Sequence, residues 1–526
     1  MSQKFISQVT FDEAVKENVT EFEMSWEEAV EDAREQFKNV DLSHLSMKPI
    51  DQRAKEPKSQ VLELLAQLDK ESTSKSSTPS TLVPVLNKFF DVLKENESSR
   101  ALVGQKNGVE ITLRNLRRLA ASSSSDAKSS DEDEDEALFV ASVRVLTILC
   151  SKTPKNRVKF AQFGEAASLI FERMKSKPTS SKTQVCGFNA VRVACTKNPQ
   201  NTNAFAKLGI LDHLLLVLKS KESSSNADVV KAIANGVWPL ARGDGSIDSK
   251  APEYQKYLAE NDAVVLFLQA LKQHQKNEDI VGSCCRAMEA ICVNDTTCKE
   301  AEEAGGLKLL TNLIRDQKDC AKVVSKCASC LSCFARSDLN KPKIVELGVC
   351  EFLVSLMQAK TFEKSPNVHI QSMKLITAVT LRQPEICERV MKCDSHSAAL
   401  GSMRLFPGNA SVQREACLML RNLVSRTKQH VKAIMQAGAE PLIRKARELH
   451  NTCEDVAFGA LRELNCDISD MKHYRDQGRA MYVSFCYSLY LHSLTPFTSL
   501  YSKHQVRYVY LIDVARGVVL KYITFV

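Results

Sequence analysis

The stretch Ala416-Cys-Leu-Met-Leu-Arg-Asn-Leu-Val424 decides the fold of this chain. Within it, Met419, Leu420 and Leu423 stand at relative positions −1, 0 and +3, which share one face of an α-helix. The same apolar pattern recurs seven more times at a nearly constant interval. The eight central residues are Leu146, Val191, Val237, Met288, Leu331, Ile376, Leu420 and Leu461, separated by 45, 46, 51, 43, 45, 44 and 41 residues. This period is typical of a helical solenoid, because a unit of this size cannot bury its own apolar face and must stack on its neighbours.

A glycine marks a second recurring position, 17 or 18 residues after the central residue in five of the units. These glycines are Gly164, Gly209, Gly305, Gly348 and Gly438. Each follows a short helical pattern and precedes an apolar one, so it predicts a tight turn between two helices. We therefore expect an all-α fold in which each unit is a short helix, a glycine turn, a second helix, a polar loop and a long third helix that carries the central residue.

This three-helix unit resembles the armadillo repeat. Residues 416–424 are similar to its third helix, and Gln436-Ala-Gly-Ala-Glu-Pro-Leu-Ile443 is similar to its turn and second helix. Within that superfamily, segments at 10–18, 40–43, 421–424 and 453–462 resemble the armadillo repeat-containing protein 6 family, over roughly residues 9–473 in one collinear order. The resemblance implies a right-handed superhelical solenoid of about eight or nine repeats whose third helices line a concave face. For biological process, it implies an association with hematopoietic (blood) progenitor cell differentiation.

Changes in composition divide the chain into four parts. Residues 1–45 carry eleven Asp and Glu against four Lys and Arg, and capping-box patterns at Thr10 and Ser25 predict an acidic pair of helices. Residues 46–80 read as a linker with a short helix at 61–68, and the solenoid is expected over 81–473. Two insertions, 120–136 and 243–261, are predicted to be loops, the first because Asp131–Glu136 is a run of six carboxylates that repel one another. The N-terminal helices could cap the first repeat or occupy the concave groove, and the sequence leaves both interpretations open.

Residues 474–526 form an atypical aromatic-rich tail. Eight of the ten tyrosines lie there, and residues 480–502 carry no charge apart from a protonatable His492. About 20 uncharged residues are enough to span a bilayer, so a membrane anchor is one interpretation. Serines, threonines and Pro496 within the stretch argue against it. We therefore expect no membrane contact unless the tail is a genuine anchor, and favour a divergent C-terminus.

Composition and motifs exclude several functional classes. The net charge is +8, but the solenoid contains no basic run interleaved with aromatic residues, so we expect no specific nucleic-acid binding. The chain lacks a phosphate-binding glycine loop, a metalloprotease motif and a nucleophile elbow, which predicts a protein without catalytic residues or cofactors. The first fifteen residues contain no long apolar stretch, so the eighteen cysteines are expected in the reducing cytoplasm, with the nucleus as a second location.

The densest cysteine cluster is Cys320, Cys327, Cys330 and Cys333. The last three are spaced three apart, which brings them near one face of a helix. Zinc sites instead place Cys-x-x-Cys on a turn, with a second pair at a fixed distance. We therefore interpret these cysteines as small core residues and predict no metal site, with metal binding or redox chemistry as the alternative.

Residues two before and one after each central residue lie on the opposite side of the third helix and should face the groove. Many are basic or amide side chains, and the partner-binding candidates are Arg144, Asn189, Arg192, Asn235, Trp238, Arg286, Lys374 and Arg421, together with Asn422, which stands two residues after Leu420. A polar helix face is often only solvated, so this alternative stays open for each residue. The repeated basic charge predicts a non-enzymatic scaffold that binds an acidic segment, extended or helical, of an unidentified protein.

A nuclear-transport-type peptide receptor is the runner-up function. Importin-type receptors hold basic signals with Trp and Asn four residues apart on successive third helices. The corresponding asparagine column retains only Asn422, and Trp238 is the only tryptophan of the solenoid. A basic groove would also repel a basic signal, so we expect this function less than the acidic-segment scaffold. A metal-binding or membrane-tethered adaptor is expected less still.

Overall fold

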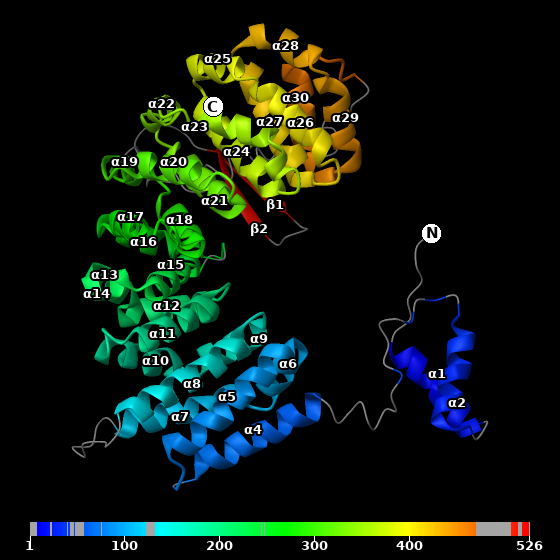
Figure 1. The fold of residues 1–526 in the computed structure, drawn as a ribbon, viewed down its shortest axis with the longest axis vertical. Coiled ribbons are helices and arrows are strands. Elements are labelled where there is room, and N and C mark those ends of the chain that lie inside the picture. The colour runs from blue at the N-terminus through cyan, green and yellow to red at the C-terminus, as the bar shows by residue number, and fades with distance from the viewer. Residues whose placement is uncertain are drawn as a thin grey trace. The chain divides into compact units, whose positions relative to one another are not determined.

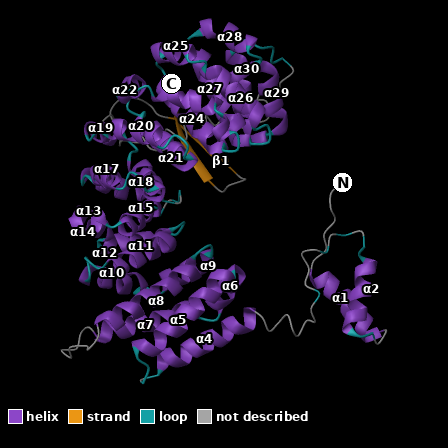
Figure 2. Cartoon of the chain, in the orientation of Figure 1, coloured by secondary structure: helices purple, strands orange, loops and turns teal. Residues whose placement is uncertain are grey.

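The structure is a computed structural model that describes residues 8–21, 24–38, 40, 42, 47, 57–74, 76–122, 132–243, 245–246, 248–469, 507–513 and 518–524. It separates into two units, residues 1–468 and 469–526. The described part of the first unit is helical, and its elements follow one another in chain order from α4 to α30 (Figures 1 and 2).

Eight complete three-helix units make up the solenoid within the described residues. The first unit comprises α6 Glu97–Gln105, α7 Gly108–Ser122 and α8 Glu132–Cys150, and the second comprises α9 Pro154–Gln162, α10 Ala166–Ser176 and α11 Ser181–Cys195. The third comprises α12 Pro199–Leu208, α13 Ile210–Lys219 with α14 Lys221–Ser225, and α15 Ala227–Arg242. The fourth comprises α16 Ala251–Glu260, α17 Ala263–Gln273 and α18 Glu278–Ile291. The fifth unit comprises α19 Asp295–Glu303, α20 Gly306–Asp316 and α21 Ala321–Phe334, and the sixth comprises α22 Asn340–Glu346, α23 Val349–Gln358 with η1 Lys360–Phe362, and α24 Pro366–Thr380. The seventh comprises α25 Pro384–Lys392, α26 Ser395–Leu405 and α27 Ala410–Ser425. The eighth comprises η2 Lys428–His430 with α28 Val431–Gln436, α29 Ala439–Leu449 with η3 Asn451–Cys453, and α30 Glu454–Glu463.

The third helices form a continuous ladder. Each of α8, α11, α15, α18, α21, α24, α27 and α30 packs against the next. All eight central residues predicted from the sequence lie on these helices and are at most 1% exposed. The residues three positions later are also buried, from Leu149 in α8 to Leu464 after α30. The predicted core column is therefore confirmed.

The turn between the first and second helices holds a left-handed residue in seven of the eight units. Four of the five predicted glycines have positive φ there, namely Gly209, Gly305, Gly348 and Gly438. Gly164 does not have positive φ, and the equivalent turns of three other units use Asn107 (φ 61°), Asp262 (φ 61°) and Asp394 (φ 56°). Asparagine and aspartate tolerate this conformation because their short side chains can hydrogen-bond locally, so glycine alone does not mark these three turns.

Helices extend into both insertions that were predicted to be loops. Helix α7 continues to Ser122 and α8 begins at Glu132, so residues 132–136 are helical. The prediction from charge repulsion was wrong there, because carboxylates are favoured in the first turn of a helix by the positive end of its dipole. Glu132 also pairs with Lys177, and Glu136 accepts hydrogen bonds from the Ser180 and Thr183 hydroxyls. In the second insertion, residues 251–260 form α16, the first helix of its unit.

The N-terminal end of the ladder is formed by α4 Pro57–Thr73 and α5 Pro79–Glu95. Helix α5 packs on α8 as a third helix does, and α4 packs on α5, α6 and α7. The buried side chains of α4 are Val61, Leu64, Leu65 and Leu68. The segment predicted as a linker with a short helix therefore contains a 17-residue helix that covers the apolar face of the first repeats.

Helices α1 Gln8–Glu21 and α2 Trp26–Gln36 have a small core of their own, centred on Phe11, Val15 and Val30. The predicted capping box at Ser25 is present: its Oγ accepts a hydrogen bond from the Glu28 N–H, and the Glu28 carboxylate accepts one from the Ser25 N–H. The pattern at Thr10 does not begin a helix, because α1 starts two residues earlier. This pair forms a compact helical hairpin at the N-terminus.

Asparagines on first helices join successive units at equivalent positions. The Asn156 amide donates to the Arg100 and Leu149 carbonyls, at 2.9 and 2.7 Å. In other units, Asn201 and Asn340 each donate to one carbonyl of the preceding first helix and one near the end of the preceding third helix. These buried bonds satisfy carbonyls at helix ends and fix the spacing of the stack.

The second unit contains two strands, β1 Arg507–Asp513 and β2 Val518–Thr524. They pair antiparallel, with Tyr510 opposite Lys521. These are the only two strands among the described residues. The uncharged stretch 480–502 lies outside the described residues. No helix in the described ranges combines the length and the apolar character needed to cross a membrane.

Candidate partner-binding face of the third helices

All nine candidate residues lie on third helices. We call the side chains that stand two before and one after the central residues of α8 to α27 the third-helix face. Arg144, Arg192, Arg286 and Lys374 are exposed, and Asn189, Asn235, Trp238, Arg421 and Asn422 are half-buried. The face is closed in places, because Thr377 and Leu418 at equivalent positions are only 3% and 8% exposed.

A hollow of about 560 Å³ opens on this face near the N-terminal end of the ladder. It brings together three of the candidates, Arg144, Asn189 and Arg192, which line it with residues of α5, α8, α11 and α15. The complete lining is Phe90, Val140, Arg144, Thr147, Ser181, Lys182, Val185, Cys186, Asn189, Arg192, Asn226 and Asp228. The hollow thus combines apolar side chains with basic and amide groups and one carboxylate, that of Asp228, a composition that suits one segment of a protein chain.

The arginines of the hollow are positioned by stacking and by partial burial. The Arg144 guanidinium lies 4.2 Å from the centre of the Phe90 ring, and its Nη1 is 3.5 Å from Asn87 Oδ1. Arg192 keeps contact with solvent, yet the wall of the hollow partly desolvates its guanidinium. This desolvation lowers the pKa of Arg192, and the positive charge of Arg286 lowers it further. Arg144 and Arg192 both line the hollow, so positive potential is concentrated there.

Trp238 is the centre of a second group on the same face. The Arg242 guanidinium carbon lies 4.6 Å from the centre of its ring, and that of Arg286 lies 5.7 Å away. Both distances are within the range of cation–π attraction. Helix α15, which carries Trp238 and Arg242, also contributes Asp228 to the lining of the hollow.

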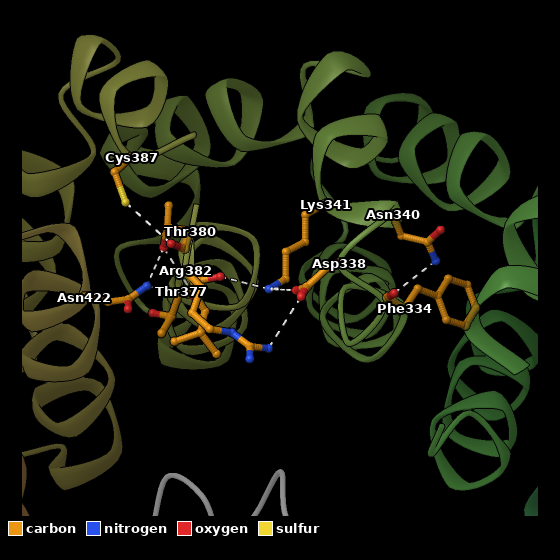
Figure 3. A network of polar contacts seen from close by, with 10 residues as sticks. Phe334, Asp338, Asn340, Lys341, Thr377, Thr380, Arg382, Cys387 and Asn422 are labelled. Atoms are coloured by element: carbon orange, nitrogen blue, oxygen red, sulfur yellow. Dashed lines mark hydrogen bonds and ion pairs between the residues drawn. The ribbon is translucent and has the colours of Figure 1, made fainter. Parts of the chain in front are cut away.

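Asn235 lies on α15 with Trp238, whereas Lys374, Arg421 and Asn422 lie further along the ladder and contact neighbouring helices. Lys374 Nζ is 3.9 Å from Glu415 Oε1, and the Arg421 side chain lies against Gly459 of α30. The Asn422 amide donates to the Thr377 carbonyl at 3.1 Å and to Thr380 Oγ1 at 2.7 Å (Figure 3). The Asn422 amide nitrogen therefore holds α27 against α24.

The structure places two residues of the cysteine cluster in the core, Cys327 and Cys330, and leaves Cys320 and Cys333 half-buried. Cys327 and Cys330 are fully buried on α21, where their thiols lie against that of Cys285 on α18. Burial raises the pKa of Cys330 well above its ordinary value. Among the described residues, no group of three or more His, Cys, Asp or Glu is arranged to hold a metal ion. The burial of Cys327 and Cys330 agrees with the interpretation of these residues as small core side chains.

Sequence reasoning missed Arg242 and Phe90. Arg242 lies outside the two columns that were considered, but it stands four residues after Trp238, which places both on one side of α15. That spacing was a usable signal. Phe90 belongs to α5, which is separated from α8 by a further pair of helices, so only the folded stack shows that it faces Arg144.

Known proteins resemble this chain along most of its length. The ARMC6 family model matches residues 61–479, and the model of the Armadillo repeat-containing protein 6 N-terminal domain matches residues 3–60. Armadillo repeat-containing protein 6 of Homo sapiens is 30% identical over 404 residues, which are 73% of this chain and 75% of the human protein. The homolog from Drosophila melanogaster is 23% identical and covers 73% of this chain and 78% of its own length.

Solved structures agree on the fold. An engineered protein superposes with a TM-score of 0.58 at 17% identity, over 88% of this chain and 99% of its own. A structure described as "A conserved phosphorylation switch controls the interaction between cadherin and beta-catenin in vitro and in vivo" superposes with a TM-score of 0.50 at 12% identity, over 76% of this chain and 68% of its own. At these identities the likeness shows the fold alone, and it confirms the predicted all-α armadillo-type solenoid. By the match of its family model and its human relative, the chain belongs to the ARMC6 family of armadillo-repeat proteins.

Proposed function

We propose that this protein is a non-enzymatic scaffold whose third-helix face binds an acidic segment, extended or helical, of another protein. The family and the solenoid fold support a protein-interaction role in general, and solenoids of this kind are typically non-catalytic. The structural relative described by the interaction of cadherin and beta-catenin supports the use of this fold for contacts between proteins.

One observation carries the proposal: basic side chains gather on this face without acidic partners of their own. Within the described residues, Lys374 is the only basic candidate that forms an ion pair, and its 3.9 Å distance is long. Arg144 and Arg286 stack on aromatic rings instead, which holds their charged N–H groups at the surface. An acidic segment would supply the missing negative charge through charge-assisted hydrogen bonds.

The proposal is tested with a fluorescein-labelled, glutamate-rich peptide and its glutamine counterpart, followed by fluorescence anisotropy. We expect the glutamate peptide to bind and the glutamine peptide to bind much more weakly, with an affinity that falls as salt is added. The double substitution Arg144→Glu and Arg192→Glu should abolish binding, because it reverses the charge of the hollow.

Lys207→Glu with Lys308→Glu is the matched control. Both lysines are exposed on first and second helices, so the change in net charge is the same while the third-helix face stays intact. Equal loss of binding in the two double variants would show that only net charge matters and would contradict the proposal. Proximity labelling in cells with the same variants would then identify the natural partner.

We also propose the cytoplasm or the nucleus as the location. The seventeen cysteines among the described residues are all free thiols, which suits a reducing compartment. A receptor for basic peptides is supported less well, because the arginines of this face would repel such a ligand.

A further inference from the structure

Two guanidinium groups from successive third helices stack against Trp238, and a third lies on the third helix before them. Arg192 comes from α11, Arg242 from α15 and Arg286 from α18. Arg242 and Arg286 both lie within stacking distance of the indole ring, at 4.6 and 5.7 Å. Arg192 lines the hollow, and burial first and the positive charge of Arg286 second lower the pKa of Arg192. We call Arg192, Arg242 and Arg286 the arginine cluster.

We propose that the arginine cluster is the binding site for a phosphorylated side chain within the partner segment. This inference rests on the proposed function, because it assigns one position of the bound segment to one part of the third-helix face. It also requires that one side chain of the bound segment be phosphorylated, which the acidic-segment proposal does not.

The charge balance of the cluster favours a dianion. No carboxylate among the described residues lies within ion-pair distance of these three guanidiniums, so their mutual repulsion is not offset by an ion pair. Glu289 interacts with Arg242 electrostatically. Glu289 is half-buried, its Oε1 has no hydrogen-bond partner, and burial raises its pKa, so it offsets the cluster poorly. A phosphoryl group carries about 1.5 to 2 negative charges near neutral pH and would balance the cluster better than one carboxylate.

Geometry favours a phosphoryl group for a second reason. A guanidinium presents its N–H donors as a planar fork, and a phosphoryl group has three acceptor oxygens that can take several such forks. Stacking on Trp238 restricts the planes of Arg242 and Arg286 before a ligand arrives, which reduces the entropy lost on binding. Arg192 also lines the hollow, so residues beside the phosphorylated one can lie there.

Trp238 itself provides the signal for a test. The chain has two tryptophans, and Trp26 lies in the N-terminal hairpin, so Trp26→Phe leaves Trp238 as the only indole. The full-length Trp26→Phe protein is titrated with a glutamate-rich peptide that contains one serine and with the same peptide carrying phosphoserine. We expect the phosphoserine peptide to change Trp238 fluorescence and to bind about tenfold more tightly than the serine peptide.

Arg242→Lys with Arg286→Lys keeps the charge and removes the planar forks, so it should abolish the preference for phosphoserine while the serine peptide still binds. Arg144→Lys is the matched control, because it makes the same change on the same face outside the cluster, and it should preserve the preference. Inorganic phosphate is expected to compete weakly, since it lacks the flanking residues.

The outcomes separate this inference from the proposed function. If both peptides bind with equal affinity, or if Arg242→Lys with Arg286→Lys leaves the preference unchanged, the phosphate site is wrong and the acidic-segment scaffold stands. If neither peptide binds, both proposals are wrong. An affinity for inorganic phosphate equal to that for the peptide would overturn the assignment of a partner side chain as the ligand.

Discussion

Among the described residues, the buried ammonium of Lys341 contacts one carbonyl and one carboxylate. Its side chain is 2% exposed, its Nζ donates to the Leu381 carbonyl at 2.9 Å, and it lies 2.5 Å from Asp338 Oδ1 (Figure 3). We expect Asp338→Ala to lower the free energy of unfolding by about 2–4 kcal/mol, because it leaves a buried charge without its counter-ion. Urea denaturation followed by circular dichroism measures the change.

Two controls bear on this prediction. Glu346 is exposed on α22, the helix that carries Lys341. Glu346→Ala should therefore change the free energy of unfolding by less than about 0.5 kcal/mol. Lys341→Met added to Asp338→Ala should recover much of the loss, since it removes the buried charge. If the Asp338→Ala and Glu346→Ala proteins are equally stable, Asp338 does not stabilise the buried ammonium of Lys341 and the prediction is wrong.

Asp279 gives a pH-dependent prediction at the same scale. Its hydrogen bonds to Lys231 on one side and Lys322 on the other lower its pKa to about 2. Because the folded pKa lies below the unfolded value, the stabilisation is fully present above the unfolded pKa of 3.8 and is lost as the pH falls towards 2. We expect Asp279→Asn to lower the melting temperature by a constant amount from neutral pH down to about pH 5, and the difference to narrow below about pH 4. A difference that grows on acidification would refute this assignment.

At the scale of elements, the turns between first and second helices differ in backbone conformation, so replacing their glycines should cost different amounts of stability. Gly305 has φ +79° and open space around it, so Gly305→Ala meets only the penalty of the left-handed backbone. We expect it to cost about 1–2 kcal/mol in the free energy of unfolding. Gly164 occupies the equivalent turn without positive φ and also has open space, so Gly164→Ala should be neutral or stabilise by up to about 1 kcal/mol. Denaturation of the two variants side by side tests this, and equal costs would contradict it.

For the whole molecule, the structure assigns the covering of the first repeats to α4, and the N-terminal hairpin has a core of its own. Deleting residues 1–56 should therefore leave the melting temperature of the solenoid nearly unchanged. Deleting residues 1–78 should lower it sharply or cause aggregation, because α5 and α7 lose the apolar side chains of α4 that cover them. If the shorter deletion already destabilises the protein, the hairpin contributes to the cap.

The shorter deletion also tests whether the acidic hairpin competes for the third-helix face. Tighter binding of the glutamate-rich peptide to the protein without residues 1–56 would favour that interpretation, because a tethered acidic segment has a high effective concentration. Unchanged affinity would leave the hairpin with a separate role.

The sequence alone determined the repeat architecture. The central residues, the residues three positions later and most turn glycines could be located because helical periodicity and left-handed turns are local properties. In a solenoid each unit contacts only its neighbours, so the stacking order follows the chain order. The family resemblance added the curvature and the identity of the lining helices.

Tertiary structure decided which side chains meet. Only the packing of α8 against α5 brings Arg144 over Phe90, and only the packing of α27 against α24 commits the Asn422 amide to Thr377 and Thr380. The acidic start of α8 was misjudged as a loop, because its stabilisation comes from the dipole of the helix it begins and from Lys177 of the next unit. These contacts join residues about 40 or more positions apart, and a local pattern cannot encode the distance between side chains on different helices.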